Sequence, residues 1–297
     1  PLALMGPAAS GRMAVAEALL NIAAAPISQI NDVKLSANWM AAAGHAGEDA
    51  ALFDTVKAIS LELCQELGVS IPVGKDSLSM KTVWQEGDEA KAVTAPLSLI
   101  VSAFAPVYDV RKTLTPELKA LDAETDLILI DLGSGKCRLG GSALAQVYKQ
   151  VGNQAPDVND AQKLSACFNT VQSLNQQGKI LAYHDRSDGG LVATLAEMMF
   201  ASHVGITIDV DELCFERRRN ERLSGEVTPD SLDRADNGRL MTALFNEELG
   251  IVIQVRREDT SAVMAAFFNA GLRSELYVLG SPNQEDKLKV KRRNRFV

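Results

Sequence analysis

Two polar residues with metal-binding chemistry lie four positions apart in an otherwise apolar stretch near the start of the chain. On a helix, Glu17 and Asn21 would share one face, about one turn apart. A carboxylate and an amide oxygen placed in this way suit Mg²⁺, which takes a few protein oxygens and completes its shell with phosphate and water. Taken alone, the pair is explained more readily by a solvated helix face. The apolar residues around it favour the functional interpretation.

A second group of polar residues lies between a short apolar strand and an apolar helix, in the stretch HDRSDGG (184–190). A strand-to-helix turn with two glycines lets backbone amides approach a phosphate, and a helix N-terminus favours negative charge there. Asp185 and Asp188 would repel that phosphate unless a cation lies between them, so the loop predicts a metal-bound nucleotide. The alternative is that Asp188 is only an N-cap and the glycines form a tight turn. We favour the functional interpretation, because polar groups converge before the glycines.

Two further glycine-containing stretches are weaker candidates. Lys75, Asp76 and Ser77 follow a glycine and have the chemistry to bind a phosphate or a metal. The spacing of a Walker A loop is absent, and a charged hairpin entry explains these residues equally well. Residues 133–142 form another Gly-rich turn before a helix, which is weak evidence by itself.

The elements that must position these residues alternate between helices and strands. Helices are predicted over 13–24, 48–67, 191–202 and 260–270, with another from Ser142. A buried strand is predicted over 94–105, and further strands over 127–132, 180–183, 204–210, 251–255 and 276–279. The chain start also reads as a strand. The last strands and the helix between them form a β-α-β unit. The pattern predicts a layered α/β (α+β) protein with two domains, 1–105 and 117–297, joined by the Pro-bounded stretch 106–116.

Composition narrows the classes of function. A net charge of −8 argues against a nucleic-acid-binding surface, because a phosphate backbone needs a basic face. No run of about 18 apolar residues occurs, so no membrane span is expected. Four widely spaced cysteines and three isolated histidines indicate free thiols in a reducing compartment, without a zinc site, and predict a cytoplasmic location. The absence of an initiator Met and of a signal peptide is interpreted as a piece of a longer polypeptide.

Most of the chain resembles the synthetase portion of formylglycinamide ribonucleotide amidotransferase (phosphoribosylformylglycinamidine synthase), and the resemblance is closest to the long single-chain bacterial type. The VGKDSLSMKT and HDRSDGG motifs are highly specific for that group. The blocks that carry the resemblance, in collinear order, are residues 14–27, 33–44, 47–59, 71–82, 181–206 and 244–255.

The resemblance implies a fold and a set of site residues. The chain would cover the later part of the N-terminal domain of the family's second aminoimidazole-ribonucleotide-synthetase-like unit, together with that unit's C-terminal α/β domain. Its sheet would pair with a pseudo-symmetric first unit, and a glutaminase domain would follow in the same polypeptide. Glu17, Asn21 and Asp185 match the family's Mg²⁺ ligands and Ser187 a nucleotide contact, while Lys75 is a candidate phosphate contact. A further ligating Asp would lie upstream of the chain.

The implied activity is that of a carbon–nitrogen ligase of purine biosynthesis with glutamine as amido donor. ATP would activate the amide oxygen of formylglycinamide ribonucleotide, and ammonia would then displace phosphate to give formylglycinamidine ribonucleotide. Two alternatives stay open: a non-catalytic, structural nucleotide-binding half, and a related enzyme of the same fold, such as thiamine-phosphate kinase or selenophosphate synthetase. The isolated chain is expected to be inactive, because it lacks the other parts.

Two stretches depart from the family pattern. Residues 215–238 are dense in charge and look like an insertion. Their composition is typical of a solvated or disordered loop, with a functional basic finger as the alternative. The start of the chain, around LMGP (4–7), lacks the Asp-containing sequence expected there. Neither departure touches the candidate ligands.

Overall fold

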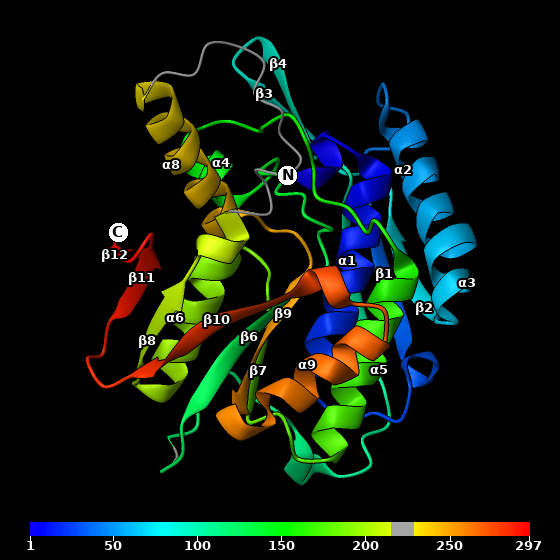
Figure 1. Ribbon diagram of the computed structural model, residues 1–297. Coiled ribbons are helices and arrows are strands. Elements are labelled where there is room, and N and C mark those ends of the chain that lie inside the picture. Colours follow the sequence, from blue (N-terminus) through cyan, green and yellow to red (C-terminus); the bar gives the residue numbers. More distant parts are fainter. Residues whose placement is uncertain (121, 215–228) are drawn as a thin grey trace.

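Two β-sheets of different size organise the computed structural model, which describes residues 1–120, 122–214 and 229–297, with only the backbone described over 229–236 (Figure 1). The smaller sheet has the strand order β2-β1-β5, and β3 and β4 form a separate hairpin. The larger sheet has the order β12-β11-β8-β10-β6-β9-β7. Helices alternate with the strands in both halves, which confirms the mixed α/β class predicted from the sequence.

The first third of the chain builds the smaller sheet and the helices beside it. Its elements are η1 (Leu2–Leu4), α1 (Pro7–Ile22), η2 (Ile30–Asp32), β1 (Lys34–Met40), α2 (Glu48–Lys57), η3 (Ala58–Leu63), α3 (Cys64–Leu67), β2 (Ser70–Ser77), β3 (Lys81–Glu86), β4 (Glu89–Thr94) and β5 (Ser98–Phe104). The prediction of a strand at the chain start is wrong, because Leu2–Leu4 form a 3₁₀ turn. The helix then begins at Pro7, whose fixed φ suits a first turn. The helix predicted over 48–67 is a single helical run that contains the π-helical segment η3 and ends at Gly68, in the left-handed conformation.

The smaller sheet is covered on one face only. In β1, Leu35 and Ala37 are buried in the same core as Leu19 and Leu20 of α1. In β5, alternate side chains are exposed, and Phe104 is 58% exposed. The expectation of a buried strand over 94–105 is therefore wrong, because no element within the described residues covers the other face of this sheet.

The rest of the chain builds the larger sheet, with helices on both faces (Figure 1). Its elements are η4 (Val110–Lys112), β6 (Thr125–Asp131), α4 (Ala143–Val147), α5 (Ala161–Gln176), β7 (Ala182–Asp185), α6 (Gly190–Ser202), β8 (Gly205–Asp209), α8 (Pro229–Phe245), β9 (Gly250–Arg256), η5 (Arg257–Asp259), α9 (Thr260–Asn269), η6 (Arg273–Glu275), β10 (Leu276–Asn283), β11 (Leu288–Arg292) and β12 (Arg295–Phe296). β9 and β10 both pair antiparallel with β6, so β9, α9 and β10 form the predicted β-α-β unit around a central strand. Every residue of β6 is buried, because Ile128 and Ile130 face the core with α5 and α9 while Leu127 and Leu129 face the core with α6.

The charged segment 215–238 is only partly described. Residues 215–228 lie outside the described part of the chain. Residues 229–238 form the first part of α8, so the expectation of a loop is wrong for that stretch.

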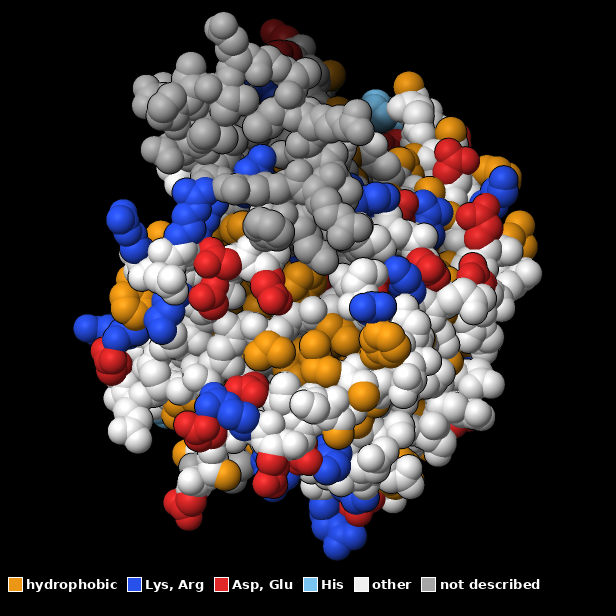
Figure 2. All heavy atoms as spheres, in the orientation of Figure 1, with side chains coloured by type: hydrophobic (Ala, Val, Ile, Leu, Met, Phe, Trp, Pro, Cys, Tyr) orange, Lys and Arg blue, Asp and Glu red, His pale blue; other side chains and the backbone are white. Residues whose placement is uncertain are grey.

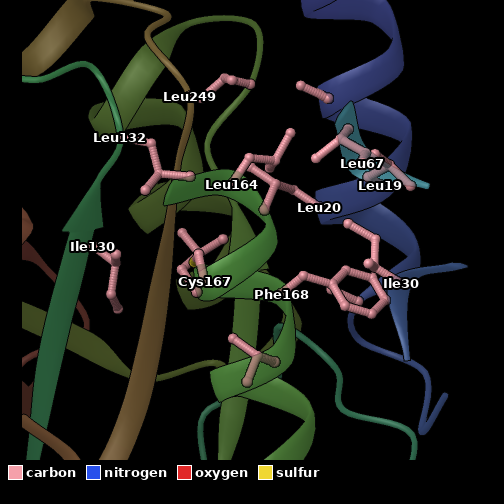
Figure 3. Close-up of a cluster of buried hydrophobic side chains, with 14 of the residues drawn as sticks. Leu19, Leu20, Ile30, Leu67, Ile130, Leu132, Leu164, Cys167, Phe168 and Leu249 are labelled. Carbon is pink, nitrogen blue, oxygen red and sulfur yellow. The ribbon is translucent and has the colours of Figure 1, made fainter. Parts of the chain in front are cut away.

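Helix α5 lies between α1 and the larger sheet and joins the two halves (Figure 3). Its residue Phe168 is fully buried among side chains from both halves. Tyr183 of β7 donates its hydroxyl to the backbone oxygen of Leu20 at 2.6 Å. Gln172 of α5 donates to the backbone oxygen of Ala23 at 2.7 Å and accepts from the backbone N–H of Ile27 at 2.9 Å. These bonds hold the end of α1 against α5 and β7.

The surface of the C-terminal edge is basic. Figure 2 shows Lys and Arg side chains gathered over β11 and β12, at the edge of the larger sheet opposite β7. Lys289 and Lys291 each lie over the ring of Phe296, 5.4 and 5.5 Å from its centre.

No helix of the described residues is both long and apolar enough to span a bilayer.

Candidate functional site

The polar face of α1 meets the carboxyl end of β7. Helix α1 buries its Val15, Ala16 and Leu19 side and leaves Glu17 and Asn21 on its accessible side. The side-chain amide of Asn21 donates to Oδ1 of Asp185, the last residue of β7, at 3.4 Å. The two halves of the chain thus bring predicted site residues from positions 164 apart in the sequence into contact.

Glu17 lies within a group of carboxylates. Its side chain keeps access to solvent, yet protein atoms crowd around the carboxyl group. This desolvation raises the pKa of Glu17, and the negative charges of Asp188, Asp185 and Glu247 raise it further. All three charges that shift this pKa are negative, so a cation at this position would relieve their mutual repulsion.

The Asp185 side chain is buried and held on its strand by neighbours. His184 Nδ1 lies 3.6 Å from Asp185 Oδ1, and His184 Nε2 lies 2.7 Å from Glu197 Oε2. Burial alone would lower the pKa of His184, but the hydrogen bonds and charges of Asp185 and Glu197 outweigh it and raise the pKa. The imidazole is therefore biased towards its charged form.

The loop after β7 is anchored by Arg186, whose side chain is 1% exposed. Its guanidinium lies 2.6 Å from Asp131 Oδ1 and donates to the backbone oxygens of Glu248 and Leu249 at 2.6 and 3.0 Å. A buried cation bound to these three acceptors fixes the residues on either side of it. Asp185 and Ser187 therefore flank a rigid anchor.

The turn into α6 requires its glycines. The N-cap of α6 is Gly189, at φ +83°, and no side chain caps the helix. The alternative of Asp188 as an N-cap is therefore wrong, and the Asp188 carboxylate is available to act on Glu17. A Cβ on Gly190 would stand 2.5 Å from the backbone oxygen of Asn246, so only glycine fits where this turn meets the loop before β9.

Sequence reasoning missed two residues of that loop, Glu247 and Glu248. Oε1 of Glu247 accepts the backbone N–H of Ala143 at 2.8 Å and that of Gly189 at 2.7 Å. The side chain of Glu248 is 0% exposed, and Arg138 lies 2.7 Å from its Oε2. The sequence signal for these two residues was a pair of adjacent glutamates just before an apolar strand. A carboxylate that is buried there needs a hydrogen-bond donor or a cation as its partner.

The structure does not bring Lys75 to this site. Lys75 lies on β2 opposite Asn38 of β1, whereas Ala37 and Trp39 on either side of Asn38 are buried. Side chains alternate along a strand, so Lys75 shares the open face of the smaller sheet, away from the core that contains α1. Its amino group donates to Ser77 Oγ at 2.5 Å. Ser187 is partly exposed in the turn after Arg186.

The donor set fits a divalent cation whose shell is completed by other ligands. No group of three or more acidic, His or Cys side chains in the described part of the chain stands close enough to enclose a metal ion by itself. Glu17 and Asp185 supply carboxylates from two elements, and Asn21 turns its amide group to face Asp185. Mg²⁺ typically takes only one or two protein carboxylates and completes its shell with phosphate oxygens and water. Rotation of the Asn21 side chain is enough to place its amide oxygen where its nitrogen now lies, so that the oxygen can act as a ligand.

Two family models match the chain. The model of the FGAR-AT PurM N-like domain matches residues 1–106. The model of the AIR synthase related protein C-terminal domain matches residues 126–293, more than half of the chain. All of the candidate site residues lie within one or the other of these ranges.

Solved structures share the fold at low sequence identity. HypE in a HypE–HypF complex has a TM-score of 0.63 at 15% identity, with 97% of this chain and 83% of that chain covered. E. coli HypE, a hydrogenase maturation protein, has a TM-score of 0.58 at 18% identity, with 94% and 75% covered. PurL of T. maritima complexed with ATP has a TM-score of 0.63 at 12% identity, with 98% and 40% covered. The chain thus spans about two fifths of that PurL, and these likenesses show the fold.

Proposed function

Because the chain belongs to the AIR synthase-related family, we propose that the junction of α1 and β7 binds a magnesium–nucleotide complex. The observation that carries this proposal is the contact of Asn21 with Asp185, which puts Glu17 beside the carboxylates of the loop. PurL of T. maritima and HypE have both been solved with ATP, which supports a nucleotide as the ligand.

In this proposal Glu17, Asn21 and Asp185 hold Mg²⁺, and Ser187 contacts the nucleotide. The bound Mg²⁺ would neutralise phosphate charge that the acidic residues alone would repel. Arg186 keeps the loop in place through its buried bonds, so the carboxylate of Asp185 is preorganised on the larger sheet. The bonds of Gln172 and Tyr183 keep α1 at the distance that lets both halves contribute oxygens.

The finer proposal is the amidation of formylglycinamide ribonucleotide. The match of residues 1–106 to the FGAR-AT model and the family motifs in the sequence support it. PurL of T. maritima has also been solved with FGAR. Transfer of the γ-phosphoryl group from ATP to the amide oxygen would release ADP. Ammonia would then form the new C–N bond as the C–O bond breaks and phosphate departs. Positioning and charge neutralisation are the main tasks of a protein in such a transfer.

We assign the other parts of this activity to a first synthetase unit and a glutaminase domain in the remainder of a longer polypeptide. The chain spans about two fifths of T. maritima PurL, and the structure of PurLQS from T. maritima also shares its fold, which supports further domains or proteins as partners. The proposed domain boundary in this chain is the stretch 106–116. Lys75 lies on the open face of the smaller sheet, so it remains a candidate phosphate contact only for a nucleotide that binds to that face.

Calorimetric titration of the 297-residue chain with Mg-ADP tests the coarser proposal. Glu17→Gln and Asp185→Asn should each weaken binding at least tenfold, in the range found for groups that hold or orient a metal. Glu66→Gln on α3 is the matched control, because Glu66 is exposed and lies outside the acidic group. Equal affinity of all four proteins would contradict the proposal.

Turnover of the complete polypeptide with formylglycinamide ribonucleotide, glutamine and ATP tests the finer proposal. The same variants should lower turnover if this site is catalytic. Normal turnover with weakened nucleotide binding would instead identify a structural nucleotide half-site, and turnover of a different phosphoryl acceptor would identify a relative with other chemistry.

A further inference from the structure

Three chain segments meet at the side chain of Glu247. Its Oε1 accepts the backbone N–H of Ala143, the first residue of α4, and that of Gly189, the N-cap of α6. Glu247 itself lies in the loop between α8 and β9. One carboxylate oxygen therefore joins the Gly-rich turn of residues 133–142 to the loop that carries Asp185.

The bond to Gly189 fixes a part of the loop that has no other side-chain hydrogen bond to the described residues. Arg186 anchors the start of the loop through Asp131. At its other end, Gly189 has a left-handed conformation and no side-chain cap. The bond of Gly189 N–H to Glu247, at 2.7 Å, is the side-chain contact that fixes this end among the described residues.

We propose that Glu247 is a positioning residue of the nucleotide site, which holds the residue 187–189 segment so that Asp185 and Ser187 stay in their binding geometry. The inference rests on the proposed function, because it concerns the same site. Glu247 acts through Gly189 and Ala143 and does not need to touch the nucleotide or the metal.

The proposal predicts different effects for the loss of the Glu247 hydrogen-bond acceptor and for the loss of its charge. Glu247→Gln keeps an oxygen that can accept both N–H groups and removes the negative charge near Asp188. Glu247→Ala removes the acceptor. The alanine variant should bind Mg-ADP about 10–100-fold more weakly, as is usual when a group that orients metal ligands is lost. The glutamine variant should stay within about threefold of the natural protein, since geometry and not charge is what its role requires.

Hydrogen exchange on the nucleotide-free chain reports positioning without any ligand. Glu247→Ala should speed exchange of the Gly189 and Ala143 amides at least tenfold, and Glu247→Gln should leave them close to the natural protein. Glu285→Ala is the control, because this exposed glutamate belongs to the turn before β11, at the other edge of the sheet. If the alanine variant does not fold, Glu247→Asp replaces it, because the shorter acid keeps the charge but cannot reach both N–H groups.

The outcomes distinguish this inference from the proposed function. Unchanged exchange at both amides in the alanine variant overturns the inference, and so does a glutamine variant that binds as weakly as the alanine variant. Absence of Mg-ADP binding by the natural chain overturns the proposed function and, with it, the role of Glu247. Normal binding by the natural chain with an alanine variant within twofold of it overturns the inference alone.

Discussion

The bridge made by Gln172 sets how firmly α1 is held to the larger sheet. Gln172 is 5% exposed, and its two bonds satisfy the backbone oxygen of Ala23 and the backbone N–H of Ile27. Gln172→Leu has nearly the same volume but neither polar atom. The substitution leaves two backbone groups unpaired in a buried position, directly after the helix that carries Glu17 and Asn21.

The cost follows from these two groups. Each unpaired group costs about 2 kcal/mol, and the added apolar surface of leucine returns about 1 kcal/mol, so unfolding should become easier by about 3 kcal/mol. Urea denaturation followed by circular dichroism measures this loss as a lower midpoint at an unchanged slope. Because residues 23–27 would loosen, the affinity for Mg-ADP should also fall several-fold.

Gln177→Leu is the matched control for this experiment. Gln177 is exposed at the end of the same helix, where its side-chain amide donates to Ser173 Oγ at 3.1 Å. Such a surface substitution should change stability by no more than about 0.5 kcal/mol. A loss below about 1 kcal/mol for Gln172→Leu would refute the reasoning, because the bridge would then hold nothing that solvent cannot replace.

Further outcomes can be measured independently. Tyr183→Phe removes the 2.6 Å bond to a backbone carbonyl of α1 and should cost about 1 kcal/mol in urea denaturation, so an unchanged midpoint would count against that bond. Glu17→Gln should raise the melting temperature of the nucleotide-free chain, because it removes one of several repelling carboxylates, and a lower melting temperature would contradict the acidic cluster. Burial raises the pKa of Cys64 to about 11 and that of Cys167 to about 12, so a thiol reagent at neutral pH should label the partly exposed Cys137 before either, and the reverse order would be inconsistent with the fold. The 297-residue chain alone should form no product from glutamine, and product detected by mass spectrometry would show otherwise.

The sequence predicted the helices and strands more accurately than it predicted which other elements cover them. β6 was evident as a continuous apolar run, because helices on both faces bury every side chain. β5 was wrongly expected to be buried, since a strand's own residues do not reveal whether a second layer covers its other face. The helix over 229–238 was missed because its charged residues mask the helical spacing.

Only some residues of the candidate site could be predicted from the sequence. Glu17 and Asn21 followed from helical spacing, and Asp185 from its place after a strand, although only the family resemblance linked the two groups. Glu247 could not be found in this way, because its partners lie 58 and 104 residues away in the sequence. The sequence also did not indicate on which face of the smaller sheet Lys75 lies, because that depends on how β2 pairs with β1.

The most direct test of the central claim is a crystal structure of the chain grown with Mn²⁺ and ADP, in which anomalous scattering locates the metal. Mn²⁺ favours the same oxygen ligands as Mg²⁺. The account predicts an anomalous peak between α1 and the end of β7, about 2–2.3 Å from carboxylate oxygens of Glu17 and Asp185 and bridged to the phosphates. A peak elsewhere in the molecule, or a bound nucleotide whose metal contacts neither carboxylate, would contradict it.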